Sequence, residues 1–334
     1  SMNEQSVGID VSKSKLDVCV LKGEKLKTKV FRNTRAGHVE LSEWLRQREL
    51  LADTPIVLEA TGPYSESVAI ALTDAGWAVS VVNPARVVGF AQSELARNKT
   101  DKADARLIAK FGQRADLDIW VAPSPATRQL RALIDRLQAL IDMRQQEKNR
   151  LEALDHGTPT TVRSMVDEHI EWLNNQIKKV QSEIDDHIDG NPELRLDAEL
   201  IESIPGIGRR AAAQFLAYIG DVRRFHNAKA LAAFIGVTPR QKQSGSSING
   251  RSRLSRAGHA SARKSLFMPG MVAKRYNPVV IAMAKRLEAR GLTAKAIVGA
   301  SMRKLVHLIY GVVKSGQPFD ARIALSKLEF QEGI

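Results

Sequence analysis

Cysteine, aromatic side chains and long uncharged apolar runs are all scarce in this sequence. Cys19 is the only cysteine in 334 residues, so no disulfide can form within the chain, and a reducing, cytoplasmic compartment is indicated. The apolar stretch 292–313 is interrupted by charged residues, among them Arg303 and Lys304, and no signal-peptide pattern is present. We therefore expect a cytoplasmic protein with no membrane partner.

Acidic residues are scarce in the last third of the chain. The formal net charge of +13 is unevenly distributed, with +1 in residues 1–120, −5 in residues 121–200 and +17 in residues 201–334. No basic helix has the bulky aromatic face of a membrane-surface helix, so this basic segment predicts binding to a polyanion, nucleic acid in particular. The 7 histidines lack the spacing of metal ligands, and a zinc site is not predicted.

The first 120 residues alternate between strand and helix patterns. Short apolar runs at 7–11, 16–21, 27–33, 55–60 and 78–82 predict strands, and helical spacing marks 37–48 and 65–75. A β-hairpin followed by alternating helices and strands is typical of an α/β domain with parallel strands. We place this domain at residues 2–121.

Four acidic residues of this domain stand out by position. Asp10 and Glu59 each lie at the end of an apolar strand, where polar side chains of α/β sheets gather. Asp101 and Asp104 are three residues apart, so they project from one face of a helical first turn that Thr100 or Asp101 would cap. Such a set suits Mg²⁺ or Mn²⁺ and a two-metal phosphoryl transfer of the ribonuclease-H-like kind. The alternatives are acids that favour a helix N-terminus and salt-bridged core acids.

Two long helical patterns occupy residues 126–190. Their apolar residues recur three or four apart. The first series is 130, 133, 137 and 140 and, after an interruption near Arg144 and Glu147, 151 and 154; the second is 166, 170, 173, 177, 180, 184 and 188. An apolar stripe this narrow packs on one other helix, and no broad apolar face remains. We therefore favour a coiled-coil arm that joins two chains. The alternative is a helical hairpin within one chain that covers a domain.

The region 195–334 opens with Pro205-Gly206-Ile207-Gly208 between two helical segments. The glycines permit a tight turn, and the second helix would present its free backbone N–H groups to a phosphate. We interpret the segment as a helix-hairpin-helix contact to DNA made by Gly206, Gly208, Arg209 and Arg210. An ordinary turn between two helices is the alternative.

A loop rich in serine, glycine and cations follows at 240–251. Ser244-Gly245-Ser246-Ser247 is flanked by cations, so hydroxyls and backbone can approach a phosphate there. The candidate backbone contacts in and after the loop are Arg240, Lys242, Arg251, Arg253, Arg256, Arg263 and Lys264. By composition alone, a run of Ser and Gly is more typical of a surface loop.

Five motifs taken together resemble a known family. They are Gly8-Ile9-Asp10, Leu58–Gly62, Asn98–Ala105, Ile204–Gly208 and Ser244–Ser247, and they follow the family's order. The sequence resembles the DEDD-type transposases of insertion sequences, which are described as bridge-RNA-guided recombinases. The resemblance covers nearly the whole chain, from Val7 to about Phe319.

The resemblance implies a RuvC-like catalytic domain whose metal-binding acids are Asp10, Glu59, Asp101 and Asp104. It implies a mainly α-helical C-terminal transposase domain whose nucleophile is Ser244, and a coiled coil that helps dimers assemble into a tetramer. It also implies a structured bridge RNA that pairs with double-stranded target and donor DNA. The protein would then be bacterial and associated with the nucleoid, with a composite site that takes its acids from one protomer and its serine from another.

Three functions remain open at this point. The first is a recombinase that cleaves and rejoins DNA through a phosphoserine intermediate. No histidine lies beside Ser244, so metal-assisted deprotonation is its expected activation. The second is a RuvC-like, metal-dependent endonuclease that resolves DNA junctions by attack of water. The third is a non-catalytic, architectural DNA-binding protein.

Overall fold

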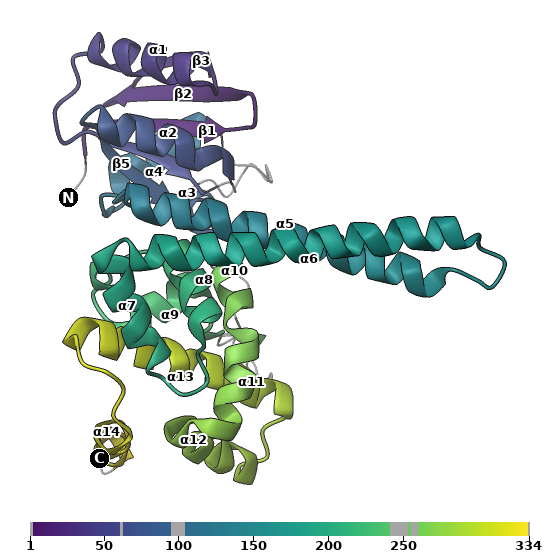
Figure 1. The fold of residues 1–334 in the computed structure, drawn as a ribbon. Helices are drawn as coiled ribbons and strands as arrows, with labels where there is room; N and C mark the ends of the chain where they lie inside the picture. The colour runs from purple at the N-terminus through teal and green to yellow at the C-terminus, as the bar shows by residue number, and fades with distance from the viewer. Residues whose placement is uncertain (1–2, 61–62, 95–103, 241–252, 255–259, 333–334) are drawn as a thin grey trace. The chain divides into compact units, whose positions relative to one another are not determined.

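The computed structural model describes residues 3–60, 63–94, 104–240, 253–254 and 260–332. The chain divides into two compact units, residues 1–122 and residues 123–334 (Figure 1). The first unit is an α/β domain, and the second is mostly helical. This division confirms the two predicted fold classes.

The first unit is built on a five-stranded sheet in the order β3-β2-β1-β4-β5 (Figure 1). Its strands are β1 (Gln5–Val11), β2 (Lys15–Lys22), β3 (Lys25–Arg32), β4 (Pro55–Glu59) and β5 (Ala78–Val82). The first three strands form an antiparallel meander, whereas β4 and β5 run parallel to β1. This order and orientation is the ribonuclease-H-like arrangement that the sequence predicted.

Helices cover both faces of the sheet because alternate strand residues point to opposite sides. The helices are α1 (Arg35–Arg46), α2 (Pro63–Asp74), α3 (Pro84–Glu94) and α4 (Ala105–Arg114). Ile9 and Leu58 belong to the core under α1 and α2, whereas Val57 and Val82 pack against α3 and α4. The candidate acidic residues of the sheet lie on the face under α4.

The second unit begins with a long helical hairpin of α5 (Pro125–Ala153) and α6 (Thr160–Asp189), which pack along each other. Their apolar seams are buried at Leu130, Ile134, Leu137, Leu140, Leu173, Ile177, Ile184 and Ile188. In the structure the two seams pack against each other within one chain, as in the alternative of a helical hairpin. A contact of this hairpin with a second chain stays a prediction. The short connection at 154–159 returns α6 onto α5, which costs less entropy than recruiting a second chain.

A polar cluster interrupts the hairpin interface around Glu147. This carboxylate is buried, with Oε2 3.0 Å from His169 Nδ1 and Oε1 2.5 Å from Arg150 Nη1. The hydrogen bonds from His169 and then from Arg150 hold the pKa of Glu147 below its ordinary value. The ionised carboxylate is therefore the form that the folded hairpin favours.

Glu147→Leu should lower the melting temperature by roughly 2–4 °C at neutral pH, because it removes one partner of a buried ionic cluster and leaves His169 and Arg150 without their acceptor. The carboxylate contributes stability above its ordinary pKa of 4.5, and this contribution disappears as the pH falls through the lowered value. The deficit of the variant should therefore shrink in acid. Thermal melts between pH 3 and 7 test this, with the exposed Glu152→Leu as control; equal melting temperatures throughout would contradict it.

Further elements follow the hairpin in the second unit, and the buried residues of most of them share one core with it. They are α7 (Pro192–Glu202), α8 (Arg209–Ile219), the 3-10 turn η1 (Val222–Arg224), α9 (Ala228–Ile235), β6 (Pro239–Arg240), β7 (Arg253–Leu254), α10 (Ala260–Ser265), α11 (Phe267–Tyr276), α12 (Pro278–Ala289), α13 (Ala294–Ser315) and α14 (Ala321–Glu332). By length and mean hydropathy α13 could span a membrane, but half of its apolar window is buried inside the unit. Its packing on α7, α9, α11 and α12 identifies it as a core helix.

Candidate active site

Asp10 and Glu59 lie side by side at the carboxyl ends of neighbouring parallel strands. Ile9 of β1 pairs with Leu58 of β4, so the two acids occupy the next position along each strand. Gly8 and Val57, two residues earlier, both face α4, and the strand alternation therefore turns both acids to that face. Glu59 is buried and Asp10 is half-buried.

Asp104 is the N-cap of α4. Its Oδ1 accepts a hydrogen bond of 2.8 Å from the Leu107 backbone N–H, with extended backbone angles at the cap. The helix therefore begins at Ala105, and the predicted cap at Thr100 or Asp101 is wrong. The short carboxylate of Asp104 already satisfies one of the free N–H groups of the first turn.

The direction of α4 brings Asp104 to the same edge of the sheet. Ala105 and Ala109 pack directly on Gly8, whereas Gly112 lies over Ser6, so α4 runs antiparallel to β1. Its N-terminus therefore lies toward the carboxyl end of β1, where Asp10 and Glu59 are. Three of the four predicted acids thus share one edge and one face of the sheet.

Asp101 and Ser244 lie outside the described residues. Within the part of the chain that the structure describes, no three Asp, Glu, His or Cys side chains come close enough to hold a metal ion. The chemistry of the donors nevertheless fits a hard divalent cation, because carboxylate oxygens are its preferred ligands. Enzymes of this fold typically use such ions.

Two neighbouring side chains on β2 were missed by the sequence reasoning. Asp17 is the antiparallel partner of Asp10, and Cys19 is the partner of Gly8, so both lie on the face of α4. Burial raises the pKa of the Cys19 thiol to about 11; Arg106 acts against this shift and Asp104 adds to it. Cys19 is thus an unreactive core residue, whereas Asp17, 3.8 Å from Lys15, adds a fourth described carboxylate near the edge. No sequence motif marks Asp17; only the pairing of β2 with β1 places it beside Asp10.

Gly8→Ala should displace α4 and cost about 2–3 kcal/mol of stability. A Cβ at this position would lie 2.2 Å from the Ala105 carbonyl oxygen and 2.4 Å from the Ala109 nitrogen, and a backbone neighbour cannot rotate away. Because α4 carries Asp104, cleavage activity should fall as well. Denaturant unfolding measures the loss; Gly89→Ala in α3, which meets nothing within 4 Å, is the matched control. Equal stability of the two variants would contradict the close approach.

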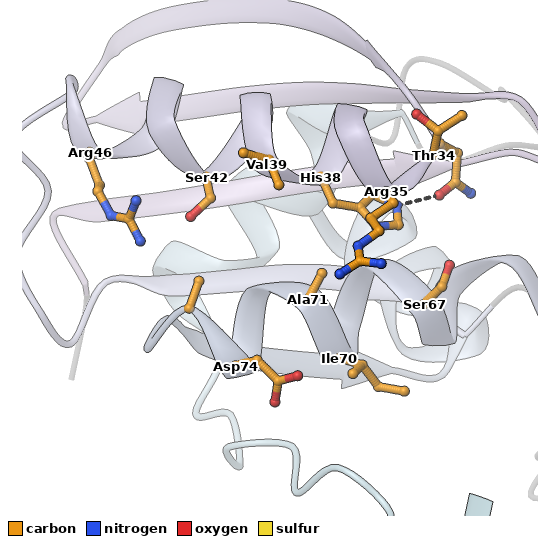
Figure 2. Close-up of a pocket in the computed structure, with 12 residues that line it drawn as sticks. Thr34, Arg35, His38, Val39, Ser42, Arg46, Ser67, Ile70, Ala71 and Asp74 are labelled. Carbon is orange, nitrogen blue, oxygen red and sulfur yellow. Dashed lines mark hydrogen bonds between the residues drawn. The ribbon is translucent and has the colours of Figure 1, made fainter. Parts of the chain in front are cut away.

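A groove of about 590 Å³ lies between α1 and α2 (Figure 2). His38 is buried at its wall, where its Nε2 is 2.8 Å from Asn33 Oδ1, and burial lowers the pKa of the imidazole. Both helices cover the face of the sheet opposite to α4. The groove is therefore separated from the acidic edge by the sheet itself.

The glycine hairpin between α7 and α8 is a packed turn. Gly206 has a φ of +105°, and a Cβ there would lie 2.8 Å from Ala273 Cα. The buried Asn277 donates from Nδ2 to the Pro205 carbonyl at 3.0 Å, and Gly208 is the exposed N-cap of α8. The turn is fixed against α11, and the first N–H groups of α8 lie beside an exposed glycine.

The two arginines after this hairpin differ in their surroundings. The Arg209 guanidinium is 2.7 Å from Asp189, 3.3 Å from Glu202 and 3.7 Å from Asp185, so three carboxylates already neutralise it. Arg210 is exposed. We therefore expect Arg210 rather than Arg209 to contact phosphate, although the sequence predicted both.

Arg210→Ala should weaken DNA binding and lower the salt slope of the affinity by roughly 1, the effect of losing one phosphate contact. Arg209→Ala should instead lower stability by ~0.5–1 kcal/mol, because it breaks the ion pairs that join α6, α7 and α8. Binding isotherms at several salt concentrations and unfolding curves separate the two effects. The reverse assignment of effects would show that Arg209 leaves its carboxylates to bind phosphate.

A short antiparallel ladder lies on either side of the serine-rich segment in the sequence. Pro239 pairs with Leu254 and Arg240 with Arg253, whereas residues 241–252 lie outside the described residues. Lys242, Arg251 and Arg256 lie outside the described residues. Arg263 and Lys264 lie in the last turn of α10, a few residues after the loop.

A ribonuclease-H-like domain with acids at one sheet edge, joined to a basic helical unit, defines a class of DNA-processing enzymes. Comparison with known proteins narrows this class. A family model described as "Transposase" matches residues 7–156, and one described as "Transposase IS116/IS110/IS902 family" matches residues 198–285.

Two relatives extend the match. The chain is 34% identical over 325 residues to the "Pilin gene-inverting protein" of Moraxella lacunata, covering 96% of this chain and 99% of that protein. It is 24% identical over 197 residues to the "Transposase for insertion sequence element IS1111A" of Coxiella burnetii, covering 51% and 52%. The chain therefore belongs to the IS116/IS110/IS902 family of transposases, and the predicted resemblance to DEDD-type insertion-sequence transposases is confirmed.

Among solved structures, "T. thermophilus RuvC in complex with Holliday junction substrate" aligns with all of its chain and 35% of this one. The identity is 15% and the TM-score 0.26. The fold assignment depends instead on the strand order and on the family match.

Proposed function

We propose that this transposase is an RNA-guided, site-specific DNA recombinase that cleaves and rejoins strands through a phosphoserine intermediate. The observation that carries the proposal is the convergence of Asp10, Glu59 and Asp104 on one edge and face of the sheet. Asp101, three residues before Asp104, would complete the set. The protein would act in the cytoplasm, on DNA of the nucleoid.

The chemistry requires a nucleophile and a means of stabilising charge on phosphate. The hydroxyl of Ser244 would attack the phosphorus, lose its proton and form a phosphoserine ester, while a deoxyribose oxygen leaves and takes up a proton. Attack by a deoxyribose hydroxyl of another strand reverses these steps, so no ATP is needed. Mg²⁺ or Mn²⁺ held by Asp10, Glu59, Asp101 and Asp104 would supply Lewis-acid stabilisation of the phosphate charge.

The second unit would hold nucleic acid without reading its sequence. A bridge RNA that pairs with target and donor DNA would supply sequence recognition, and the protein would bind duplex backbones. The charge of +17 on residues 201–334 supports this division of labour. Backbone contacts would come from Gly206, Gly208, Arg210, Arg240, Lys242, Arg251, Arg253, Arg256, Arg263 and Lys264, and binding should weaken steeply with salt.

Ser244 lies 140 positions after Asp104 and further still from the other acids in the sequence, so folding or assembly must unite them. We propose a homo-oligomer, a dimer that assembles to a tetramer, in which acids of one protomer meet the serine of another. A shared site would allow cleavage only after the partners have assembled on DNA.

The test is a reaction with two DNA substrates and RNA transcribed from DNA that flanks the coding region. A recombinase yields new junctions between the two DNAs, and omission of the RNA should abolish them. A junction-resolving endonuclease yields only hydrolysed strands, with or without the RNA. Hydrolysed ends without any joined product would overturn the proposal.

A further inference from the structure

Helix α11 presents an exposed apolar stripe. The stripe consists of Phe267, Met268, Met271, Val272 and Tyr276, each between 38% and 68% exposed. Its members form two rows at four-residue spacing, which is the pattern of a helix face that packs on another helix. The opposite face of α11 is buried, with Gly270 against Met302 and Ala273 against Gly206. Apolar surface concentrated in this way marks an interaction site.

The surroundings of this α11 stripe are basic. Arg275 lies within the exposed face, and Lys264 is exposed one turn before the stripe begins. No acidic residue occurs anywhere between Asp221 and Glu288. A partner for the α11 stripe must therefore combine apolar side chains with negative charge.

Helix α6 carries a second apolar stripe, on its N-terminal half. Val162, Met165 and Trp172 are 41%, 64% and 50% exposed, and His169 stacks on Trp172 with ring centroids 6.1 Å apart. Spacings of three, four and three place these residues along one face. This α6 stripe is distinct from the seam toward α5, which contains the buried Leu173.

The surroundings of the α6 stripe are acidic. Glu168 lies three residues after Met165 and four before Trp172, and Glu171 is adjacent. Residues 147–172 contain six acidic and three basic residues. The α6 stripe thus has the apolar character and the charge that the α11 stripe requires.

We propose that the α6 stripe of one chain docks on the α11 stripe of a second copy, with Glu168 facing Arg275. The inference rests on the homo-oligomer of the proposed function and names the surfaces that build it. Within the chain α6 packs on α5 and α7, whereas α11 packs on α10, α12 and α13. In a two-fold dimer the contact occurs twice, which closes the assembly. If nucleic acid covered the α11 stripe instead, the apolar α6 stripe would stay exposed to water. The acidic residues beside the α6 stripe would repel nucleic acid there.

Cysteine crosslinking tests the contact, because the single native cysteine, Cys19, is fully buried. Met165→Cys protein mixed with Met271→Cys protein, without DNA or metal, should form a disulfide-linked dimer on mild oxidation. The control pairs Met165→Cys with Ile119→Cys, which at 68% is more exposed than Met271 at 43% but lies in the first unit. Crosslinking no faster than this control would overturn the proposal.

A charge exchange provides the second test. Glu168→Arg and Arg275→Glu should each weaken self-association roughly tenfold in analytical ultracentrifugation, and the double variant should recover most of the loss. Glu183→Arg, on the exposed C-terminal half of α6, should have no effect. If Arg275→Glu weakens nucleic-acid binding while neither change alters self-association, α11 binds nucleic acid and the proposal is wrong. That outcome would leave cleavage and joining by the acids and Ser244 intact.

Discussion

Asp10→Asn and Glu59→Gln should each lower strand cleavage by roughly a thousandfold while DNA binding stays unchanged. Each change removes a negative charge from the edge that α4 covers, with little change in volume. Glu59 is buried at the end of β4, so the amide keeps the packing. Gel assays of strand cleavage, with circular dichroism as a check of folding, measure the effect.

Asp74→Asn is the matched control for these substitutions. Asp74 is an exposed carboxylate of the same unit, and it lines the groove on the opposite face of the sheet. Its loss should leave cleavage unchanged. Full activity of both Asp10→Asn and Glu59→Gln would contradict a catalytic edge and favour an architectural DNA-binding protein.

Mixing a Ser244→Ala protein with an Asp101→Ala protein should restore part of the recombination activity that each protein lacks alone. A mixed assembly contains a site with intact acids from one chain and an intact serine from the other. Recombination of labelled DNA, measured over a range of mixing ratios, should peak near equal amounts. Mixing two batches of Ser244→Ala protein is the control. No recovery at any ratio would place acids and serine in one chain.

The strands and the acidic edge could be predicted because their signals are local. Apolar runs mark β1, β4 and β5, and a strand-end acid is conspicuous at Asp10 and at Glu59. The start of α4 could not be predicted in the same way. Residues 98–104 contain several residues that can cap a helix, and the choice of Asp104 depends on how α4 packs on Gly8.

Which helices and side chains contact each other could not be predicted from the sequence. A seam such as Leu130 to Leu140 specifies a facing helix, but the same pattern serves a partner in the same chain or in another. Likewise Arg209 and Arg210 are equivalent in sequence, and only the positions of Asp185, Asp189 and Glu202 distinguish them. Asp17 became a candidate only through its register with Asp10. Long-range contacts of this kind leave no local pattern.

The most direct test of the account is to trap the protein on a DNA substrate whose cleaved end cannot be rejoined. We predict a covalent protein–DNA adduct that requires a divalent cation, maps by peptide mass spectrometry to Ser244, and is absent in Ser244→Ala protein. DNA cut without any adduct, or an adduct on another residue, would contradict the account.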